Sequence, residues 1–225
     1  MGSDPALADV GTSQQPCPGD HAPSKGGQQR LGPRFDEALL FASGLHRQQV
    51  RKGTGGTPYI SHLLAVCALV LENGADEDEV IAALLHDAAE DQGGEATVVE
   101  IASRFGKRVA SIVSGCSDTL ERPKPPAHQR KEAYLARLDD AGTPRSVLLV
   151  AAADRLHNLR STLADHRSAG ELLWERFKLS PAEQFWYHQS ASDIFDRRLG
   201  GQLAEELKRL LPELAAATGG GSQLR

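Results

Sequence analysis

The spacing of apolar residues is the feature of this sequence that most restricts its fold. Through most of the chain, apolar side chains recur at intervals of three and four, and one such series is Ile60, Leu63, Leu64 and Cys67. This repeat is typical of an amphipathic helix that buries one face. No segment alternates with the period of two that a half-buried strand requires. We therefore predict an all-α protein.

The helix boundaries can be predicted from local signals. Predicted helices cover residues 35–52, 59–74, 77–91, 97–105, 107–117, 127–140, 144–166, 180–199 and 202–217. Thr97 with Glu100, and Ser180 with Glu183, have the spacing of a capping box at a helix start. Pro212 lies inside the last predicted helix, and we expect it to kink that helix or to split it in two.

Length and composition predict one globular domain with short tails. The chain has 225 residues, of which 40% are hydrophobic and 24% are charged, as in ordinary globular proteins. Residues 1–34 contain no Phe, Tyr, Trp or Ile and are rich in Gly, Pro, Ser and Gln, so we expect a disordered tail. We place the domain at 35–199, a C-terminal helix at 200–217 and a flexible tail at 218–225.

Charge and cysteine usage narrow the function classes. The net charge of −5 argues against nucleic-acid binding, because a duplex-binding domain usually carries a basic excess. Three cysteines without a C-x-x-C spacing indicate neither a disulfide framework nor a zinc-thiolate site, which favours a reducing cytoplasm. We find no apolar run long enough to span a membrane and no signal peptide.

The stretch from Ala82 to Asp91 is the most informative for chemistry. His86 and Glu90 are four residues apart, as are Asp87 and Asp91, so in a helix both pairs share one end and adjoining faces. Burial of such groups is costly unless a cation neutralises them, which favours a divalent metal site. A solvated acidic helix end with an incidental histidine accounts for this stretch equally well.

Two further positions could join such a site. Asp154 and Asn158 are four apart at the end of an apolar helical run, where a carboxylate needs a cation. That cation could simply be Arg155 or Arg160 in an ion pair. His62 lies on the first turns of a helix that follows a glycine-rich loop, and alone it would be an ordinary polar helix residue.

Taken together, these motifs resemble a known family. An isolated histidine, a His-Asp doublet and a distant aspartate follow the ligand order of the HD phosphohydrolase superfamily. The runs His46–Lys52, Gly56–His62, Leu85–Asp91 and Ala153–Arg160 are similar to the hydrolase domain of Rel/SpoT alarmone enzymes. The resemblance covers roughly residues 35–199 and leaves no room for a synthetase domain. It implies an HD-domain helical bundle and a small stand-alone hydrolase that converts (p)ppGpp to GDP or GTP and pyrophosphate.

The resemblance also implies a role for individual residues. It implies one metal ion per chain, usually Mn²⁺ although other divalent metals are compatible, held by His62, His86, Asp87 and Asp154. The acidic pair that orients and deprotonates the attacking water is Glu90 and Asp91. The implied substrate contacts are Arg47, Arg51, Lys52, Tyr59 and Asn158, with Arg47 one turn before Arg51 on the same helical face. The basic members could instead form a solvated helix face.

Other residues in these motifs receive smaller roles. His46 and His157 do not match metal ligands, and we expect them to be structural or to support the ligands. The remaining histidines, which we expect in tail or surface positions, are His21, His128, His166 and His188. Tyr187 could border a nucleotide pocket. Three positions depart from the family pattern: Leu63 replaces a proline, Gln92 a threonine and Ala151 a lysine.

Two alternatives to this function remain open. The same chemistry could act on another nucleotide, such as (p)ppApp or NADPH, or the chain could be a nucleotide-sensing HD module without turnover. The intact ligand set and the Glu90–Asp91 pair argue against a pure sensor. The leucine stripe of the last helix could pack on its own bundle or form a homodimer; it consists of Leu203, Leu207, Leu210, Leu211 and Leu214. We expect no nucleic-acid or membrane partner.

Overall fold

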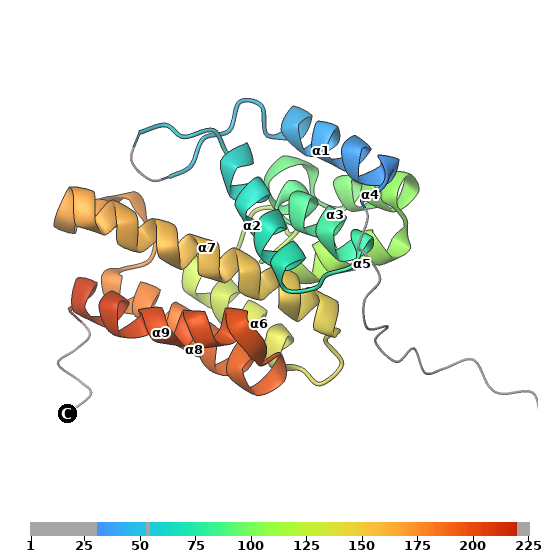
Figure 1. Ribbon diagram of the computed structural model, residues 1–225. Helices are drawn as coiled ribbons and strands as arrows, with labels where there is room; N and C mark the ends of the chain where they lie inside the picture. Colours follow the sequence, from blue (N-terminus) through green and yellow to red (C-terminus); the bar gives the residue numbers. More distant parts are fainter. Residues whose placement is uncertain (1–30, 53–54, 220–225) are drawn as a thin grey trace, which may run out of the picture.

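The computed structural model describes residues 31–52 and 55–219, and these residues form a helical bundle (Figure 1). The elements are α1 (Pro33–Leu45), α2 (Ile60–Glu72), α3 (Glu77–Leu85), η1 (Ala89–Gly93), α4 (Glu95–Phe105), α5 (Lys107–Cys116), α6 (Ala127–Asp139), α7 (Arg145–Ala169), η2 (Gly170–Arg176), α8 (Pro181–Arg198) and α9 (Gly201–Ala217). Within the described residues, β-pairing is limited to one isolated antiparallel bridge between Val50 and Pro58. The predicted all-α class is confirmed.

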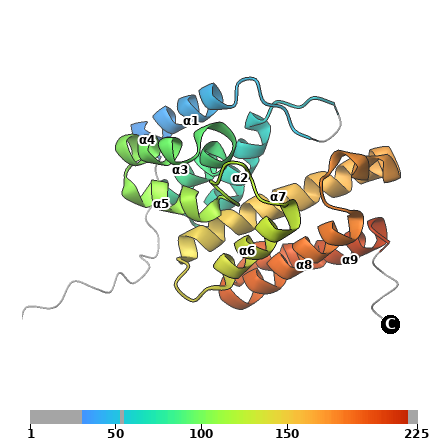
Figure 2. The same ribbon diagram turned by 180° about the vertical axis from the view of Figure 1, so that it is seen from behind.

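The long helix α7 forms the spine of the bundle. Helices α1–α5 lie on one side of it and α6, α8 and α9 on the other, as the two opposite views in Figures 1 and 2 show. Because α7 is covered from both sides, its residues Val147–Ala153 are all buried in succession rather than along one stripe. Asp154 follows this run and therefore lies deep between the two halves of the bundle.

Helix α3 delivers the His-Asp doublet to the same depth. A capping box fixes its start, because Asp76 accepts the Glu79 backbone N–H and Glu79 accepts the Asp76 backbone N–H. From Val80 to Leu85 every residue is fully buried against its neighbours. The apolar helix thus carries His86, which directly follows Leu85, into the interior.

The first predicted helix, 35–52, is shorter than expected. Helix α1 ends at Leu45, and the chain then forms a loop in which Arg51 N–H donates to Thr57 and Tyr59 N–H donates to Gln49. These cross-loop hydrogen bonds draw residues 49–51 into an extended path. In this segment, hydrogen bonds across the loop replace the hydrogen bonds that a continued α-helix would make.

The predicted helix 77–91 changes geometry at the doublet. Helix α3 ends at Leu85, His86 and Asp87 form a turn, and the chain widens into the single π-turn η1. Gly94 closes this turn by donating to Ala89 (2.8 Å), at a positive φ of 62° that favours glycine. The predicted cap at Thr97 is wrong, because the turn leads directly into α4 at Glu95 and Thr97 lies buried in its first turn.

The C-terminal helices follow the sequence signals more closely. The capping box of Ser180 and Glu183 is present at the start of α8, as predicted. Helix α9 is not split at Pro212. Leu203, Leu207 and Leu214 are buried, and α9 lies against α7 and α8.

The expected tails lie mostly outside the described residues. Of the predicted N-terminal tail, residues 1–30 are outside them, as are 220–225 of the C-terminal one. The predicted tail is too long by two described residues, because Pro33 and Arg34 belong to α1, where Arg34 forms ion pairs with Glu77 and Asp78. No helix in the described ranges combines the length and apolar character needed to cross a bilayer.

Candidate metal centre

Two imidazoles and two carboxylates meet between α2, the end of α3 and α7. Asp87 Oδ2 lies 3.0 Å from His86 Nε2 and 3.5 Å from His62 Nε2. Asp154 Oδ1 lies 3.1 Å from His62 Nε2 and 3.5 Å from His86 Nε2. Each imidazole therefore faces both carboxylates. Ligand atoms of His62, His86 and Asp154 all lie within 4.8 Å of one another, close enough for one metal ion.

Hydrogen bonds on the outer nitrogens orient both imidazoles toward the cluster. His86 Nδ1 lies 2.8 Å from the carbonyl oxygen of Ala83, and because a carbonyl only accepts, Nδ1 carries a proton and Nε2 is the nitrogen that can bind a metal ion. His62 Nδ1 lies 2.8 Å from His157 Nδ1. Both Nε2 atoms are buried and have no hydrogen-bond partner among the described residues. Buried, unpartnered imidazole nitrogens facing carboxylates fit a metal ion.

The electrostatics of the cluster agree with this fit. Burial alone would raise the pKa values of Asp87 and Asp154 and lower the pKa of His86. The attraction between the carboxylates and the imidazoles outweighs burial: it holds the pKa values of Asp87 and Asp154 well below, and that of His86 well above, their usual values. Without a cation, a proton on His86 therefore neutralises part of the carboxylate charge that a metal ion would otherwise neutralise. Burial, together with His62 and Arg51, lowers the pKa of His157 to about 4. His157 is therefore neutral near pH 7, and its Nδ1 can accept the proton that His62 Nδ1 donates. That arrangement leaves the His62 Nε2 lone pair free for a cation.

A ring of polar contacts surrounds the two carboxylates. The Tyr59 hydroxyl donates to Asp87 Oδ2 (2.5 Å), and Asn158 Nδ2 donates to Asp154 Oδ1 (2.5 Å). Burial first, and then Asp87, raises the pKa of Tyr59, so this hydroxyl keeps its proton and remains a donor. Arg155 Nη2 lies 3.6 Å from the second oxygen, Asp154 Oδ2. Asp154 therefore makes the ion pair with Arg155 that the sequence suggested through one oxygen and faces both imidazoles through the other.

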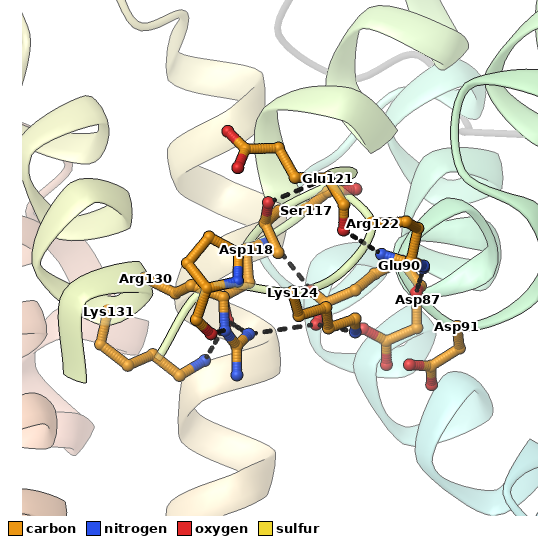
Figure 3. Close-up of polar contacts among 12 residues, drawn as sticks. Asp87, Glu90, Asp91, Ser117, Asp118, Glu121, Arg122, Lys124, Arg130 and Lys131 are labelled. Carbon is orange, nitrogen blue, oxygen red and sulfur yellow. Dashed lines mark hydrogen bonds and ion pairs between the residues drawn. The ribbon is translucent and has the colours of Figure 1, made fainter. Parts of the chain in front are cut away.

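Glu90 and Asp91, which follow the doublet, are held by two different loops. Glu90 Oε2 accepts the Asp118 backbone N–H (2.9 Å) and Oε1 pairs with Lys124 Nζ (3.0 Å), both in the α5–α6 loop (Figure 3). Asp91 Oδ2 accepts from Gln49 Nε2 (2.7 Å) in the α1–α2 loop. The π-turn therefore directs two adjacent carboxylates to opposite flanks of the cluster.

Basic side chains of α6 support the loop that holds Glu90. Asp118 is buried, and its Oδ2 pairs with Arg130 and, at 3.2 Å, with Lys131 (Figure 3). We did not predict this network, because Asp118 is distant in sequence from Glu90 and belongs to no motif. The one available signal was an acidic residue directly after an apolar helix, which is weak evidence alone.

The predicted substrate contacts are only partly brought together. Tyr59 and Asn158 touch the cluster, and Arg51 Nη2 donates to Asn158 Oδ1 (2.9 Å). Arg47 and Lys52 are exposed, and no hydrogen bond or ion pair of either side chain is found among the described residues. Arg47 and Arg51 do not share a helical face as predicted, because α1 ends before both.

One of the histidines outside the cluster, His188, does not lie where the sequence predicted. His188, predicted at the surface, is buried because it continues the inward face of α8 that Gln184, Ser192 and Phe195 also occupy at helical spacing. Burial, followed by Arg155, holds the pKa of His188 well below its usual value. His128 is exposed and stacks on Trp186, and His166 is partly buried beside Trp174. His21 lies outside the described residues.

The three departures from the family pattern have distinct environments. Leu63 and Ala151 are buried in the core, so neither side chain faces solvent. Gln92 Nε2 donates to Gln49 Oε1 (2.9 Å), beside Asp91.

Tyr187 is buried, its hydroxyl accepts from Arg155 Nη2 (2.8 Å), and Lys131 Nζ lies 4.7 Å from its ring centre.

Comparison with known proteins identifies the family to which this chain is similar. The HD domain family model matches residues 38–176. A probable guanosine-3′,5′-bis(diphosphate) 3′-pyrophosphohydrolase of Synechocystis sp. is 34% identical over 166 residues, which is 70% of this chain and 19% of that protein. The guanosine-3′,5′-bis(diphosphate) 3′-pyrophosphohydrolase MESH1 of Danio rerio is 36% identical over 126 residues, which is 55% of this chain and 66% of that protein. The chain spans about a fifth of the length of its bacterial relatives.

Solved structures show the same architecture. A metazoan SpoT orthologue, described as hydrolysing ppGpp, superposes with a TM-score of 0.67 at 25% identity and covers 83% of this chain and 98% of its own. A Listeria monocytogenes EGD-e protein superposes with a TM-score of 0.59 at 29% identity and covers 71% of this chain and 99% of its own.

Proposed function

Because this chain belongs to the HD domain family, which matches residues 38–176, we propose that it is a metal-dependent hydrolase that removes the 3′-pyrophosphate of (p)ppGpp. The products are GDP or GTP and pyrophosphate. The observation that carries the proposal is the buried cluster in which each of two imidazole Nε2 atoms faces two carboxylates at 3.0–3.5 Å. The activities by which the relatives are named supply the substrate class.

The proposed metal ligands are the four members of the cluster: His62, His86, Asp87 and Asp154. Two nitrogen and two oxygen donors suit Mn²⁺ and leave positions for water and a phosphate oxygen, so we propose Mn²⁺ as the cofactor. When bound, the ion supplies Lewis-acid stabilisation of phosphate charge and lowers the pKa of a coordinated water.

We assign proton transfer to the two carboxylates that follow the His-Asp doublet, Glu90 and Asp91. One water is consumed: its oxygen bonds to phosphorus, the bond from phosphorus to the 3′-oxygen breaks, and the proton that the water gives up is passed on to the 3′-oxygen as it leaves. The carboxylate proposed to take the proton of the water is Asp91, with Glu90 completing the acidic pair. General acid–base help of this kind contributes typically about 10²–10⁴-fold.

Substrate binding is proposed on the α1–α2 loop side. Arg51 lies against Asn158, and Tyr59 against Asp87, so both positions adjoin the cluster. Lys52 and Arg47 are exposed on the same loop and add positive charge for a phosphate-rich nucleotide.

We propose the cytoplasm as the place of action, because the free thiols of Cys67 and Cys116 suit a reducing compartment.

The decisive experiment is a substrate panel. Purified protein with Mn²⁺ is incubated separately with ppGpp, pppGpp, ppApp and NADPH, and the products are separated by ion-exchange chromatography. We expect GDP and pyrophosphate from ppGpp and no product in the presence of a chelator. Preferential turnover of ppApp or NADPH would replace the guanosine substrate, and binding of ppGpp without turnover would identify a sensing module instead.

A further inference from the structure

The side chain of Gln49 joins the α1–α2 loop to the π-turn that carries Asp91. Its Nε2 donates to Asp91 Oδ2 (2.7 Å). Its Oε1 accepts from Gln92 Nε2 (2.9 Å) and lies 2.7 Å from His46 Nδ1. One amide therefore contacts the carboxylate that we assign to proton transfer and two further polar side chains.

These contacts fix which way the amide points. Asp91 Oδ2 accepts this hydrogen bond, so the amide nitrogen must face Asp91. The amide oxygen then faces two donors, Gln92 Nε2 and His46 Nδ1–H. A flipped amide would place its oxygen against the Asp91 carboxylate and lose that hydrogen bond.

The backbone of Gln49 is also hydrogen-bonded. Its carbonyl oxygen accepts the Tyr59 N–H (2.9 Å), directly before helix α2, which carries His62. The His46 ring is buried and stacks on the Tyr59 ring at 5.1 Å between centres. Gln49 is thus anchored to the same helix that supplies one imidazole of the cluster.

This anchoring determines which oxygen of Asp91 remains available. Oδ2 is occupied by Gln49, whereas none of the hydrogen bonds found among the described residues reaches Oδ1. Asp91 itself is exposed, so without a partner its side chain would sample several rotamers. A carboxylate that is fixed at one oxygen and open at the other can accept a proton in a defined direction.

We propose that Gln49 is a positioning residue for Asp91, and that Gln92 clamps the Gln49 amide in its working orientation. The inference rests on the proposed function, because it assumes that Asp91 receives a proton during hydrolysis. It also explains the departure at position 92, since a glutamine there reaches the Gln49 oxygen at 2.9 Å.

The test compares Gln49→Glu with Gln49→Ala and Gln92→Ala. Gln49→Glu keeps the shape but sets a second carboxylate against Asp91, so we expect kcat to fall roughly 100-fold, and roughly 10-fold for Gln49→Ala, with KM changed less than about twofold. Gln92→Ala should lower kcat by roughly threefold, because the Asp91 contact itself survives. Manganese binding should stay at the wild-type level in all three. The matched control is Gln48→Glu, which adds the same charge at an exposed neighbour.

Each outcome decides the inference. If the wild type turns over ppGpp but Gln49→Glu and Gln49→Ala keep a kcat like that of Gln48→Glu, or if their loss of kcat follows a loss of manganese, the inference is wrong. If the wild type turns over no substrate in the panel, the proposed function fails separately. Coupling is then measured from melting temperatures in a double-mutant cycle of Gln49→Ala and Asp91→Ala, where additivity contradicts the contact and non-additivity supports it.

Discussion

Replacing His157 tests whether the outer contacts of the cluster set its metal affinity. His157 is the partner of His62 Nδ1 at 2.8 Å, and His62 is buried. His157→Ala leaves that nitrogen without its acceptor and frees the ring to change tautomer. Loss of such a supporting contact typically weakens metal binding about 10- to 100-fold, or about 1.4–2.7 kcal/mol.

The assay is a titration of the metal-free protein with Mn²⁺ by isothermal calorimetry near pH 7. His157→Gln is the rescue variant, because its amide oxygen can accept from His62 Nδ1 and should recover part of the affinity. His128→Ala is the control, since that histidine is exposed and stacks on Trp186. If His157→Ala folds and binds Mn²⁺ within about twofold of the wild type, the tautomer argument is refuted.

Four further changes probe separate parts of the molecule. Asp87→Ala should abolish manganese binding, measured as metal content after dialysis, and wild-type content would remove it from the ligand set. Glu90→Gln should retain manganese and lose roughly 10²–10⁴-fold in kcat for ppGpp, and a near-normal kcat would make Glu90 structural. Truncation after residue 200 should lower the melting temperature but not metal content, and loss of metal from a folded product would show that α9 shapes the centre. Pro212→Ala should raise the free energy of unfolding by about 2 kcal/mol in urea titrations, because it restores a helical N–H, and a decrease would contradict this.

The sequence predicts elements whose signals are local. The capping box at Ser180 and the helical periodicity of α2 and α7 act within a few residues, so they correspond closely to the structure. The cluster was also predictable, because its members belong to short motifs in a fixed order. The structure brings these residues together between α2, the end of α3 and α7, and their role as metal ligands stays a prediction.

What the sequence did not predict depends on contacts between distant segments. The loop after α1 is extended because residues 49–51 pair with 57–59, a contact that competes with helix only once the turn has closed. The π-turn at the doublet requires Gly94 at positive φ and cannot be distinguished from helix by spacing. The partners of Glu90 and Asp91 lie on two separate loops, so no pattern in the motif itself indicates them.

The convergence of α2, the end of α3 and α7 on one point has a thermodynamic consequence for the whole chain. A cation bound there would join three segments that are far apart in sequence, and the unfolded chain would not offer the same set of ligands. Folding and cation binding would therefore be linked, so free cation at about 1,000 times its dissociation constant would add about 4 kcal/mol to the free energy of unfolding. The thermal resistance of this protein should thus rise and fall with the supply of metal in its surroundings, independently of any substrate.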